Sequence, residues 1–313
     1  MSVVFIENVT DSKLKNNLIR DLKRKWIASE HWFTNNVQEL KKLYAPDKFK
    51  LGGSTYTVPS GEKKILEDNK KDIFNKIKED TLVFWGAGRK EAWMVNNLYS
   101  VNKLKSVVII DVEKSYVEEM IDLIKPEIRD KLKIYGLIDF FQSVSTIKEL
   151  IRNRLNISSC FHVCLGTTIG NFNKDEILSV FKEIAEGKEE FLIGLQLEKD
   201  PDKILEEYSK DENFTNVIAI PELKELEDNN IGKSYWDYDR EENAVKFWFE
   251  FLENYELKVL DEIITFKKGD KIEIFRSKKY ILDDFKNMLE KHSFKILNNF
   301  KYKDHCLLLI EKN

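Results

Sequence analysis

The chain has 313 residues, enough to bury a large core as one big domain or as two of ordinary size. Its 51 basic and 55 acidic residues are spread along the sequence and leave a formal charge of -4. This balance gives no basic field for nucleic acid and no polybasic segment for a membrane surface. The N-terminus turns polar too soon for a signal peptide, and no apolar run approaches the roughly 18 residues of a membrane span. We therefore expect a soluble cytoplasmic protein that binds neither nucleic acid nor membrane.

The first 60 residues look helical and then become irregular around "KLGGSTYTVPSGE". From about residue 62, apolar runs of strand length alternate with segments of helical periodicity. Five such strand–helix units in series predict a parallel sheet with helices on both faces. The strands are expected at residues 81–86, 106–111, 131–139, 160–166 and 190–198.

The end of the chain has a different pattern. "FKILNNFKYKDHCLLLIEK" reads as two strands around a polar turn, which predicts an antiparallel pair closing the sheet edge. Residues 199–280 carry a mixed segment with strands expected in "AVKFWFEFL" and across Leu257–Phe266. We predict one domain from residues 62–198 and 281–313. Residues 1–61 and 199–280 would form a smaller substrate-binding domain, a lid over the carboxyl ends of the strands.

The first two strands end in residues suited to a nucleoside. "VFWGAGRKEAW" places Gly86, Ala87 and Gly88 in a tight turn that lets a ligand approach the backbone, although Lys90 stands where a third small residue is usual. Asp111 ends the second strand, where a carboxylate can accept hydrogen bonds from both ribose hydroxyls. A cap for the following helix is the alternative role of Asp111.

The third and fourth strands also end in candidate ligand contacts. Asp139 can bond an exocyclic adenine amine while the ring of Phe140 packs on the base. The fourth strand runs into "LGTTIGNF", in which Gly166 either allows a plain turn or lets a small molecule approach. A dinucleotide dehydrogenase stays possible. The absent third glycine and the terminal antiparallel pair favour a Rossmann-like, doubly wound class I methyltransferase that uses S-adenosylmethionine.

Three blocks of the sequence resemble the histidine-specific methyltransferase family, which includes the enzyme that makes histidine betaine in ergothioneine biosynthesis. They are "LGTTIGNF" (165–172), "FLIGLQLEKDPDKILEEY" (191–208) and "GDKIEIFRSKKY" (269–280), within a similarity over roughly residues 62–313. The resemblance implies S-adenosyl-L-methionine as methyl donor and the α-amine of an amino acid as acceptor. It also implies cofactor contacts from the glycine turn, from Asp111, from the Asp139–Phe140 pair and from Gly166.

The resemblance further implies which residues contact the acceptor. Asn171 would grip the amino and carboxylate groups of the amino acid, and Tyr56 and Tyr208 are the matches to tyrosines that hold the carboxylate. The family's late block has a glutamate and a serine on the histidine imidazole. Here Ser277 remains, but Phe275 replaces the glutamate. A phenyl ring accepts no such hydrogen bond, and an unpaired polar group costs roughly 1–3 kcal/mol.

Histidine is therefore only one candidate acceptor, and an aromatic or apolar amino acid is at least as plausible. Two other hypotheses stay open: methylation of a small molecule that is not an amino acid, and a binding module of the same fold without turnover. No metal ligand set is recognisable. His162, within an apolar strand, is expected to be a satisfied core residue, and Cys160, Cys164 and Cys306 to be buried free thiols. The acceptor's identity, the number of methyl transfers and the oligomeric state cannot be predicted from the sequence.

Overall fold

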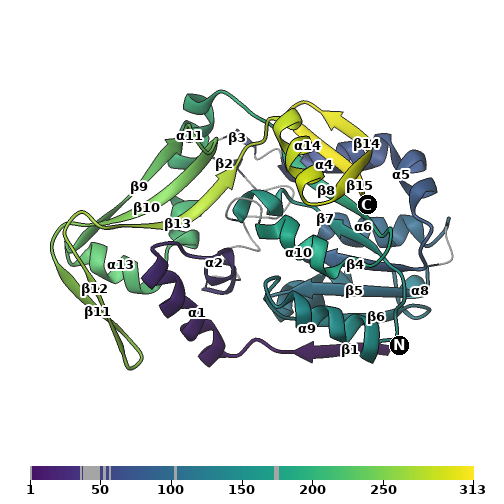
Figure 1. The fold of residues 1–313 in the computed structure, drawn as a ribbon, viewed down its shortest axis with the longest axis horizontal. Coiled ribbons are helices and arrows are strands. Elements are labelled where there is room, and N and C mark those ends of the chain that lie inside the picture. The colour runs from purple at the N-terminus through teal and green to yellow at the C-terminus, as the bar shows by residue number, and fades with distance from the viewer. Residues whose placement is uncertain are drawn as a thin grey trace.

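The protein is described by a computed structural model for residues 2–35, 37, 50–51, 54–55, 58–101, 104–172 and 176–313. Its largest sheet has eight strands in the order β1-β6-β5-β4-β7-β8-β15-β14 (Figure 1). The first six in this order are parallel, whereas β15 runs antiparallel to both β8 and β14. The predicted parallel sheet with a terminal antiparallel pair is confirmed. The strands are β1 (Ser2–Glu7), β4 (Thr81–Trp85), β5 (Ser106–Asp111), β6 (Lys133–Ile138), β7 (Phe161–Cys164), β8 (Glu190–Gln196), β14 (Phe294–Tyr302) and β15 (His305–Lys312).

Helices cover both faces of this sheet, because its central strands are apolar on both sides. In β4, Val83 and Trp85 join one buried cluster, while Leu82 and Phe84 join another on the opposite face. This explains why the strand reads as a continuous apolar run rather than an alternation. The helices of this part are α4 (Val58–Asp68), α5 (Lys70–Lys76), α6 (Arg89–Leu98), α7 (Lys114–Asp122), α8 (Pro126–Arg129), α9 (Val144–Glu149) with the π-helical turn η1 (Leu150–Arg154), α10 (Glu176–Ile184) and α14 (Leu282–Lys291).

The N-terminal strand β1 was not predicted, and it changes one expected boundary. It pairs in parallel with β6, so residues 2–7 are part of the large sheet, whereas we assigned residues 1–61 to the smaller domain. Phe5 lies opposite Gly136, where an added Cβ would come within 2.7 Å of the Phe5 ring. Gly136 therefore leaves the space that the Phe5 ring occupies. The rest of the predicted division into two domains remains a prediction.

The second structural unit is a three-stranded sheet in the order β13-β10-β9, seen at the left of Figure 1. The prediction of a strand in "AVKFWFEFL" is confirmed by β10 (Ala244–Phe251), whereas β9 (Gly232–Asp239) and β13 (Lys271–Lys278) were missed. The single strand expected across Leu257–Phe266 is wrong. That segment is a hairpin of β11 (Tyr255–Val259) and β12 (Glu262–Phe266), which turns at Leu260 with φ 55°.

One face of this small sheet forms a third apolar core. Helices α1 (Asp11–Arg24), α2 (Ser29–Asn35), α11 (Pro201–Ser209), α12 (Glu212–Ile218) and α13 (Pro221–Asp228) contribute to it. Leu22 and Trp32 of the N-terminal helices pack in the same cluster as Phe249 of β10. Helices α1 and α2 thus pack with residues 199–280 in one apolar cluster. Strands β2 (Lys50–Leu51) and β3 (Ser54–Thr55) form a separate short hairpin.

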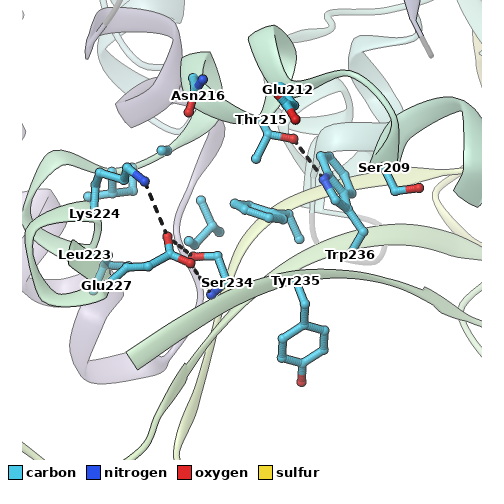
Figure 2. A pocket seen from close by; sticks show the side chains of 14 residues that line it. Ser209, Glu212, Thr215, Asn216, Leu223, Lys224, Glu227, Ser234, Tyr235 and Trp236 are labelled. Carbon is cyan, nitrogen blue, oxygen red and sulfur yellow. Dashed lines mark hydrogen bonds and ion pairs between the residues drawn. The ribbon is translucent and has the colours of Figure 1, made fainter. Parts of the chain in front are cut away.

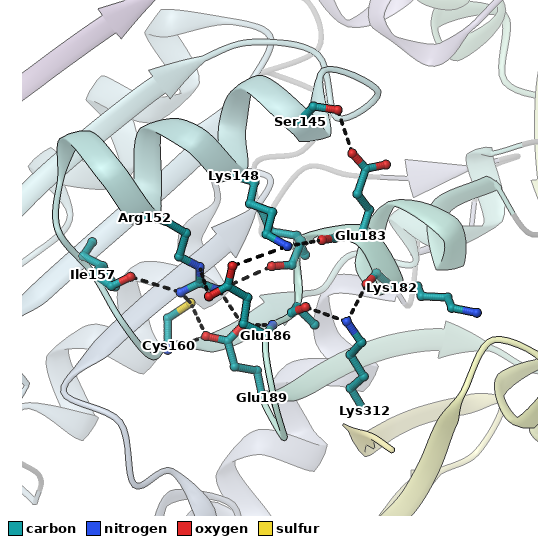
Figure 3. A network of polar contacts seen from close by, with 12 residues as sticks. Ser145, Lys148, Arg152, Ile157, Cys160, Lys182, Glu183, Glu186, Glu189 and Lys312 are labelled. Atoms are coloured by element: carbon teal, nitrogen blue, oxygen red, sulfur yellow. Dashed lines mark hydrogen bonds and ion pairs between the residues drawn. The ribbon is translucent and has the colours of Figure 1, made fainter.

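A buried polar network lies at the amino ends of β7 and β8 (Figure 3). The Arg152 guanidinium bonds the Glu189 carboxylate at 2.6 Å, and that carboxylate also contacts His162 and the amide of Cys160. The predictions that His162 is a satisfied core residue and that the three cysteines are buried free thiols are confirmed. Burial pushes the pKa of Glu189 upward, but the hydrogen bonds from His162 and Arg152 outweigh it and lower the pKa to about 2.

Among the helices that the structure describes, none combines the length and the apolar character that a membrane crossing requires.

Candidate cofactor and acceptor site

The glycine turn follows β4 directly. Gly86 has φ 101°, a left-handed conformation that favours glycine, and a Cβ added there would meet no atom within 4 Å. The space over this residue is open, as a ligand that approaches the backbone requires. Gly88 caps the start of α6 and lies against the buried carboxylate of Glu91, 2.4 Å from the position of an added Cβ. Burial raises the pKa of Glu91 above its usual range, which Lys90 partly offsets.

Asp111 closes the second strand beside this turn. Its carboxylate accepts hydrogen bonds from the amide of Ala87 at 2.9 Å and from the amide of Glu113 at 3.1 Å. Burial nevertheless raises the pKa of Asp111 to about 6, against these hydrogen bonds. The alternative role as a helix cap is wrong, because α7 is capped by Glu113, whose side chain accepts from the Ser115 amide.

Asp139 and Phe140 follow β6, next to Asp111 in the sheet. The Asp139 amide bonds the carbonyl of Asp111 at 3.1 Å, so the second and third strand ends are adjacent. The Asp139 carboxylate is buried and accepts from Asn8 at 2.9 Å and from Lys13 at 3.2 Å. Lys13 also lies 5.0 Å from the centre of the Phe140 ring. The chain that leaves β1 therefore covers this strand end, and the adenine contact remains a prediction.

Glu62 is a residue that the sequence analysis missed. It lies on α4, fully buried, and accepts hydrogen bonds from the amides of Gly166 at 2.8 Å and Thr167 at 3.2 Å. Lys90 forms an ion pair with the same carboxylate. Gly166 has φ 78°, and the nearest atom to an added Cβ is 3.6 Å away. Lys90 stands where a small residue is usual after the glycine turn, and its side chain here pairs with the buried Glu62 carboxylate. Within "GEKKIL", no spacing distinguishes Glu62 from a solvated charge on a helix face.

The segment after β7 packs directly on the small sheet. It forms a 3-10 turn, η2 (Thr168–Asn171), and an added Cβ on Gly170 would come within 2.9 Å of the Lys278 carbonyl oxygen of β13. The Tyr280 hydroxyl also donates to the Ile169 carbonyl at 3.2 Å. Glycine at position 170 therefore allows the close approach that places the half-buried Asn171 beside the end of β13.

Tyr208 and Ser277, two of the residues expected to contact the acceptor, lie in contact with each other. The Tyr208 hydroxyl donates to Ser277 Oγ at 3.1 Å, and both side chains are buried. Burial raises the pKa of Tyr208 to about 12, so its phenol is protonated at neutral pH. Lys279 lies against the pair, 2.6 Å from Ser277 Oγ and 3.4 Å from the Tyr208 hydroxyl. Gln196, the last residue of β8, accepts from Lys279 at 2.7 Å. Neither Lys279 nor Gln196 was predicted from the sequence as part of the site.

Phe275 is surrounded by aromatic rings rather than by polar groups. It is 5% exposed, and its ring centre lies between 5.2 and 5.9 Å from those of four neighbours. Phe275, which stands where the similar family has a glutamate, is therefore part of an apolar aromatic cluster in this protein. The four rings belong to Trp32, Tyr208, Phe214 and Trp236.

A cavity of about 320 Å³ borders this aromatic cluster, between α12, α13 and the small sheet (Figure 2). Trp236 belongs to both, and its indole nitrogen donates to Thr215 at 3.0 Å on the cavity wall. Glu227, which bonds Ser234, and Lys224 supply polar groups on another side. Figure 2 shows Tyr235 directed away from these groups. The cavity is therefore a neighbour of the Phe275 cluster with a mixed polar and apolar lining.

Among the described residues, two groups of side chains have the spacing of metal ligands, and in each group one carboxylate is already bonded. In Cys160–His162–Glu189, the carboxylate pairs with Arg152. In Asp21–Glu30–His31, Asp21 accepts from Arg20 and from the amide of Ala28, and it also contacts His31. Neighbouring groups thus already bond the Glu189 carboxylate of the first group and the Asp21 carboxylate of the second. That the site needs no metal remains a prediction.

Two sets of predicted residues come together at the carboxyl ends of the strands. Gly86, Ala87, Gly88 and Asp111 form one group, and Tyr208, Phe275 and Ser277 form another beside η2. Tyr56 lies outside the described residues. The open glycine turn and the carboxylate at the end of the second strand fit an adenosyl ligand with free ribose hydroxyls. Together with the strand order, these features define a Rossmann-like methyltransferase fold.

The chain belongs to the family of histidine-specific, S-adenosylmethionine-dependent methyltransferases, because the model of that family matches residues 52–311. It is therefore an enzyme that uses S-adenosylmethionine, as the sequence blocks implied. None of the curated proteins compared with the chain matches it.

The solved structures whose backbones superpose on this chain have low sequence identity to it. The 1,6-didemethyltoxoflavin-N1-methyltransferase of Burkholderia thailandensis is 8% identical, with a TM-score of 0.41 over 98% of this chain and 92% of that one. An S-adenosylmethionine-dependent methyltransferase of Anabaena variabilis is 10% identical, with a TM-score of 0.45 over 100% of this chain and 99% of that one. The assignment rests on the family model.

Proposed function

We propose that this enzyme transfers a methyl group from S-adenosylmethionine to the α-amine of an amino acid, with an aromatic or apolar side chain at least as well accepted as histidine. The proposal is supported above all by the close packing of η2 against the end of β13. Gly170 approaches the Lys278 backbone so closely that Asn171, Ser277 and Tyr208 all lie around one strand end. This group offers an amide and two hydroxyls, which suit the amine and carboxylate of an amino acid.

The cofactor would lie over the glycine turn, with its ribose on Asp111 and its adenine near Asp139 and Phe140. When bound, it supplies an electrophilic methyl on a sulfonium. The acceptor nitrogen must present a lone pair, so the amine has to lose its proton before the transfer. The reaction then yields S-adenosylhomocysteine and the methylated amine. The protein's contribution is mainly to align the two reactants and to exclude water.

Phe275 supports the choice of acceptor side chain. An imidazole N–H directed at this ring would lack the carboxylate that the family's usual glutamate provides. An unpaired polar group of this kind costs roughly 1–3 kcal/mol, or about one to two powers of ten in preference. An aromatic or apolar side chain carries no such cost. The same ring favours the second candidate, a small acceptor that is not an amino acid.

The test is to incubate the purified protein with S-adenosylmethionine and a pool of free amino acids, and to follow mass gains of one, two or three methyl groups. Methylation of an aromatic or apolar amino acid supports the proposal. Trimethylated histidine as the main product would mean that Phe275 is a tolerated replacement. No product, with S-adenosylhomocysteine still bound, would redirect the search to other small acceptors. No product and no binding would overturn the enzymatic role.

A further inference from the structure

Lys279 is a buried amine whose charge is not matched by a carboxylate. Its side chain is 1% exposed, and among the described residues its contacts are the neutral oxygens of Gln196, Ser277 and Tyr208. Lys246 on β10 is equally buried, yet it forms ion pairs with three carboxylates. Burial of an unpaired charge is costly, so the arrangement around Lys279 needs a reason beyond packing.

The hydrogen-bond count shows how Lys279 can act. An ammonium has three N–H donors, and three oxygens lie within 3.4 Å of Nζ. No donor is then left over for a ligand, so Lys279 works through Ser277 and Tyr208. Tyr208 donates its own proton to Ser277 Oγ, which accepts from Lys279 as well. Among the described residues, the Ser277 hydroxyl accepts twice and donates to none, so its proton stays free for an acceptor molecule.

The other charged groups near Lys279 are already engaged. From the β8–α11 connection, Lys199 contacts Asp304 at 2.8 Å and Glu207 of α11 at 3.8 Å. Asp304, in the β14–β15 turn, also contacts His305 at 3.1 Å. Burial and, second to it, the charge of Lys199 lower the pKa of Lys279 to about 7, while Asp304 and Glu207 oppose the shift. A negatively charged group arriving at Tyr208 and Ser277 would supply the missing counter-charge.

We propose that Lys279 is the positioning residue of the acceptor site: its ammonium fixes the Tyr208 hydroxyl as a donor to Ser277 Oγ, which leaves the Ser277 proton for the acceptor, and its charge balances a carboxylate on the acceptor. The inference rests on the proposed function in one respect, namely that the acceptor binds beside these two hydroxyls. It adds that the acceptor must carry a carboxylate. Without the ammonium, one hydroxyl proton turns toward the lysine nitrogen and the carboxylate loses both a donor and its counter-charge.

Binding of 3-phenylpropanoate to the S-adenosylhomocysteine complex tests this directly. The molecule has a carboxylate and no amine, so proton uptake on binding reports on the protein alone. Calorimetry in two buffers of different ionisation heat should show uptake of about half a proton near pH 7, because a group at its pKa is half protonated. Affinity should fall by up to about tenfold per pH unit above pH 7. Phenethylamine, which lacks the carboxylate, should show no such uptake.

Three variants complete the experiment. K279M should bind 3-phenylpropanoate at least about tenfold more weakly and without proton uptake, whereas K279R should recover part of the affinity. K246M is the matched control, because it removes another buried lysine of the small sheet and should keep the wild-type pH profile. Equal loss in K246M, or unchanged binding in K279M, would overturn the proposal. If K279M does not fold, the wild-type protein provides the test: absence of proton uptake on binding 3-phenylpropanoate near pH 7 would overturn the proposal.

The outcome separates this inference from the proposed function. Amino acids methylated by the wild type, with the same KM and pH profile in K279M, would leave the function standing and remove the role of Lys279. If no amino acid is methylated but 3-phenylpropanoate binding depends on Lys279, the role of Lys279 stands and the proposed function is overturned. Failure of the wild-type protein to bind 3-phenylpropanoate would overturn the carboxylate requirement.

Discussion

Two buried polar clusters lie at opposite ends of the large sheet and differ in charge balance. At the amino ends of β7 and β8, Arg152 and Glu189 form a buried ion pair, and the Glu189 carboxylate also contacts the His162 ring. At the carboxyl end of β8, Lys279 has a charge but only neutral partners within bonding distance among the described residues. The first cluster is complete within the protein, while the second lacks a counter-charge.

This difference indicates what each cluster does. A matched pair with a network of hydrogen bonds fixes the chain and needs nothing from outside. An unmatched charge raises the energy of the free protein and is compensated when a ligand of opposite sign binds, which is typical of binding sites. The pKa directions agree, because Glu189 is shifted toward its charged form and Lys279 toward its neutral form. The four predictions below run from the largest effect to the smallest.

The Arg152→Met substitution should destabilise the fold most. It leaves the Glu189 carboxylate, which is 3% exposed, without its guanidinium partner. Removing one member of a buried pair costs about 3–5 kcal/mol. Chemical denaturation followed by circular dichroism would measure the loss, and the affinity for S-adenosylhomocysteine should stay at the wild-type value under native conditions.

A double variant, R152M with E189L, is the control for that prediction. It removes both charges and should regain most of the lost stability. A double variant no more stable than R152M would contradict the view that the unpaired carboxylate causes the loss.

The Lys279→Met substitution should change stability in a pH-dependent way. The unfolded lysine binds its proton up to its ordinary pKa of about 10.4, whereas the folded one releases it near pH 7. Burial of this lysine therefore destabilises the wild-type protein most below pH 7, and the protein regains roughly 3–4 kcal/mol as the pH rises from about 7 to 10. K279M should lack this gain. Parallel pH curves for the two proteins, from thermal or denaturant unfolding between pH 6 and 10, would contradict a depressed pKa.

The Asp111→Asn substitution should weaken the binding of S-adenosylhomocysteine by about a hundredfold, because an ionised acceptor of two ribose hydroxyls is lost. The wild-type protein should also bind it more weakly below pH 6, where a carboxyl of pKa about 6 takes up its proton. D111N should lose this pH dependence. The affinity can be measured by calorimetry between pH 5 and 8. Glu113→Gln, which alters the cap of α7, is the control and should change affinity little.

Much of the large sheet could be predicted from the sequence, because buried parallel strands leave long apolar runs and end at polar residues. The small sheet could not be predicted in the same way. The segment "GKSYWDYD" of β9 has no strict alternation and no aliphatic residue, and with its glycine, serine and three charged residues it resembles a loop. Strand β1 was missed because its partner β6 lies more than 120 residues further along the chain.

Within the site, residues in a short motif could be predicted and those that depend on tertiary contact could not. Gly86, Gly88 and Asp111 follow one another at strand ends, and the structure places them together. Glu62 and Lys279 look like surface charges in the sequence. Only the fold shows that each is buried against a strand end, where the charge has functional consequences.

The Phe275→Glu substitution should give the smallest effect, a change of acceptor preference. It places a carboxylate where an imidazole N–H can donate to it, which should raise the ratio of kcat/KM for histidine over phenylalanine by about tenfold. Some stability is lost, because a charge enters a cluster of aromatic rings. A competition assay with equal amounts of both amino acids and mass detection measures the ratio. F275L is the control, since it also opens space among the rings but adds no hydrogen-bond acceptor. If both variants shift the ratio equally, cavity size and not the carboxylate sets the preference, and Phe275 excludes histidine by volume.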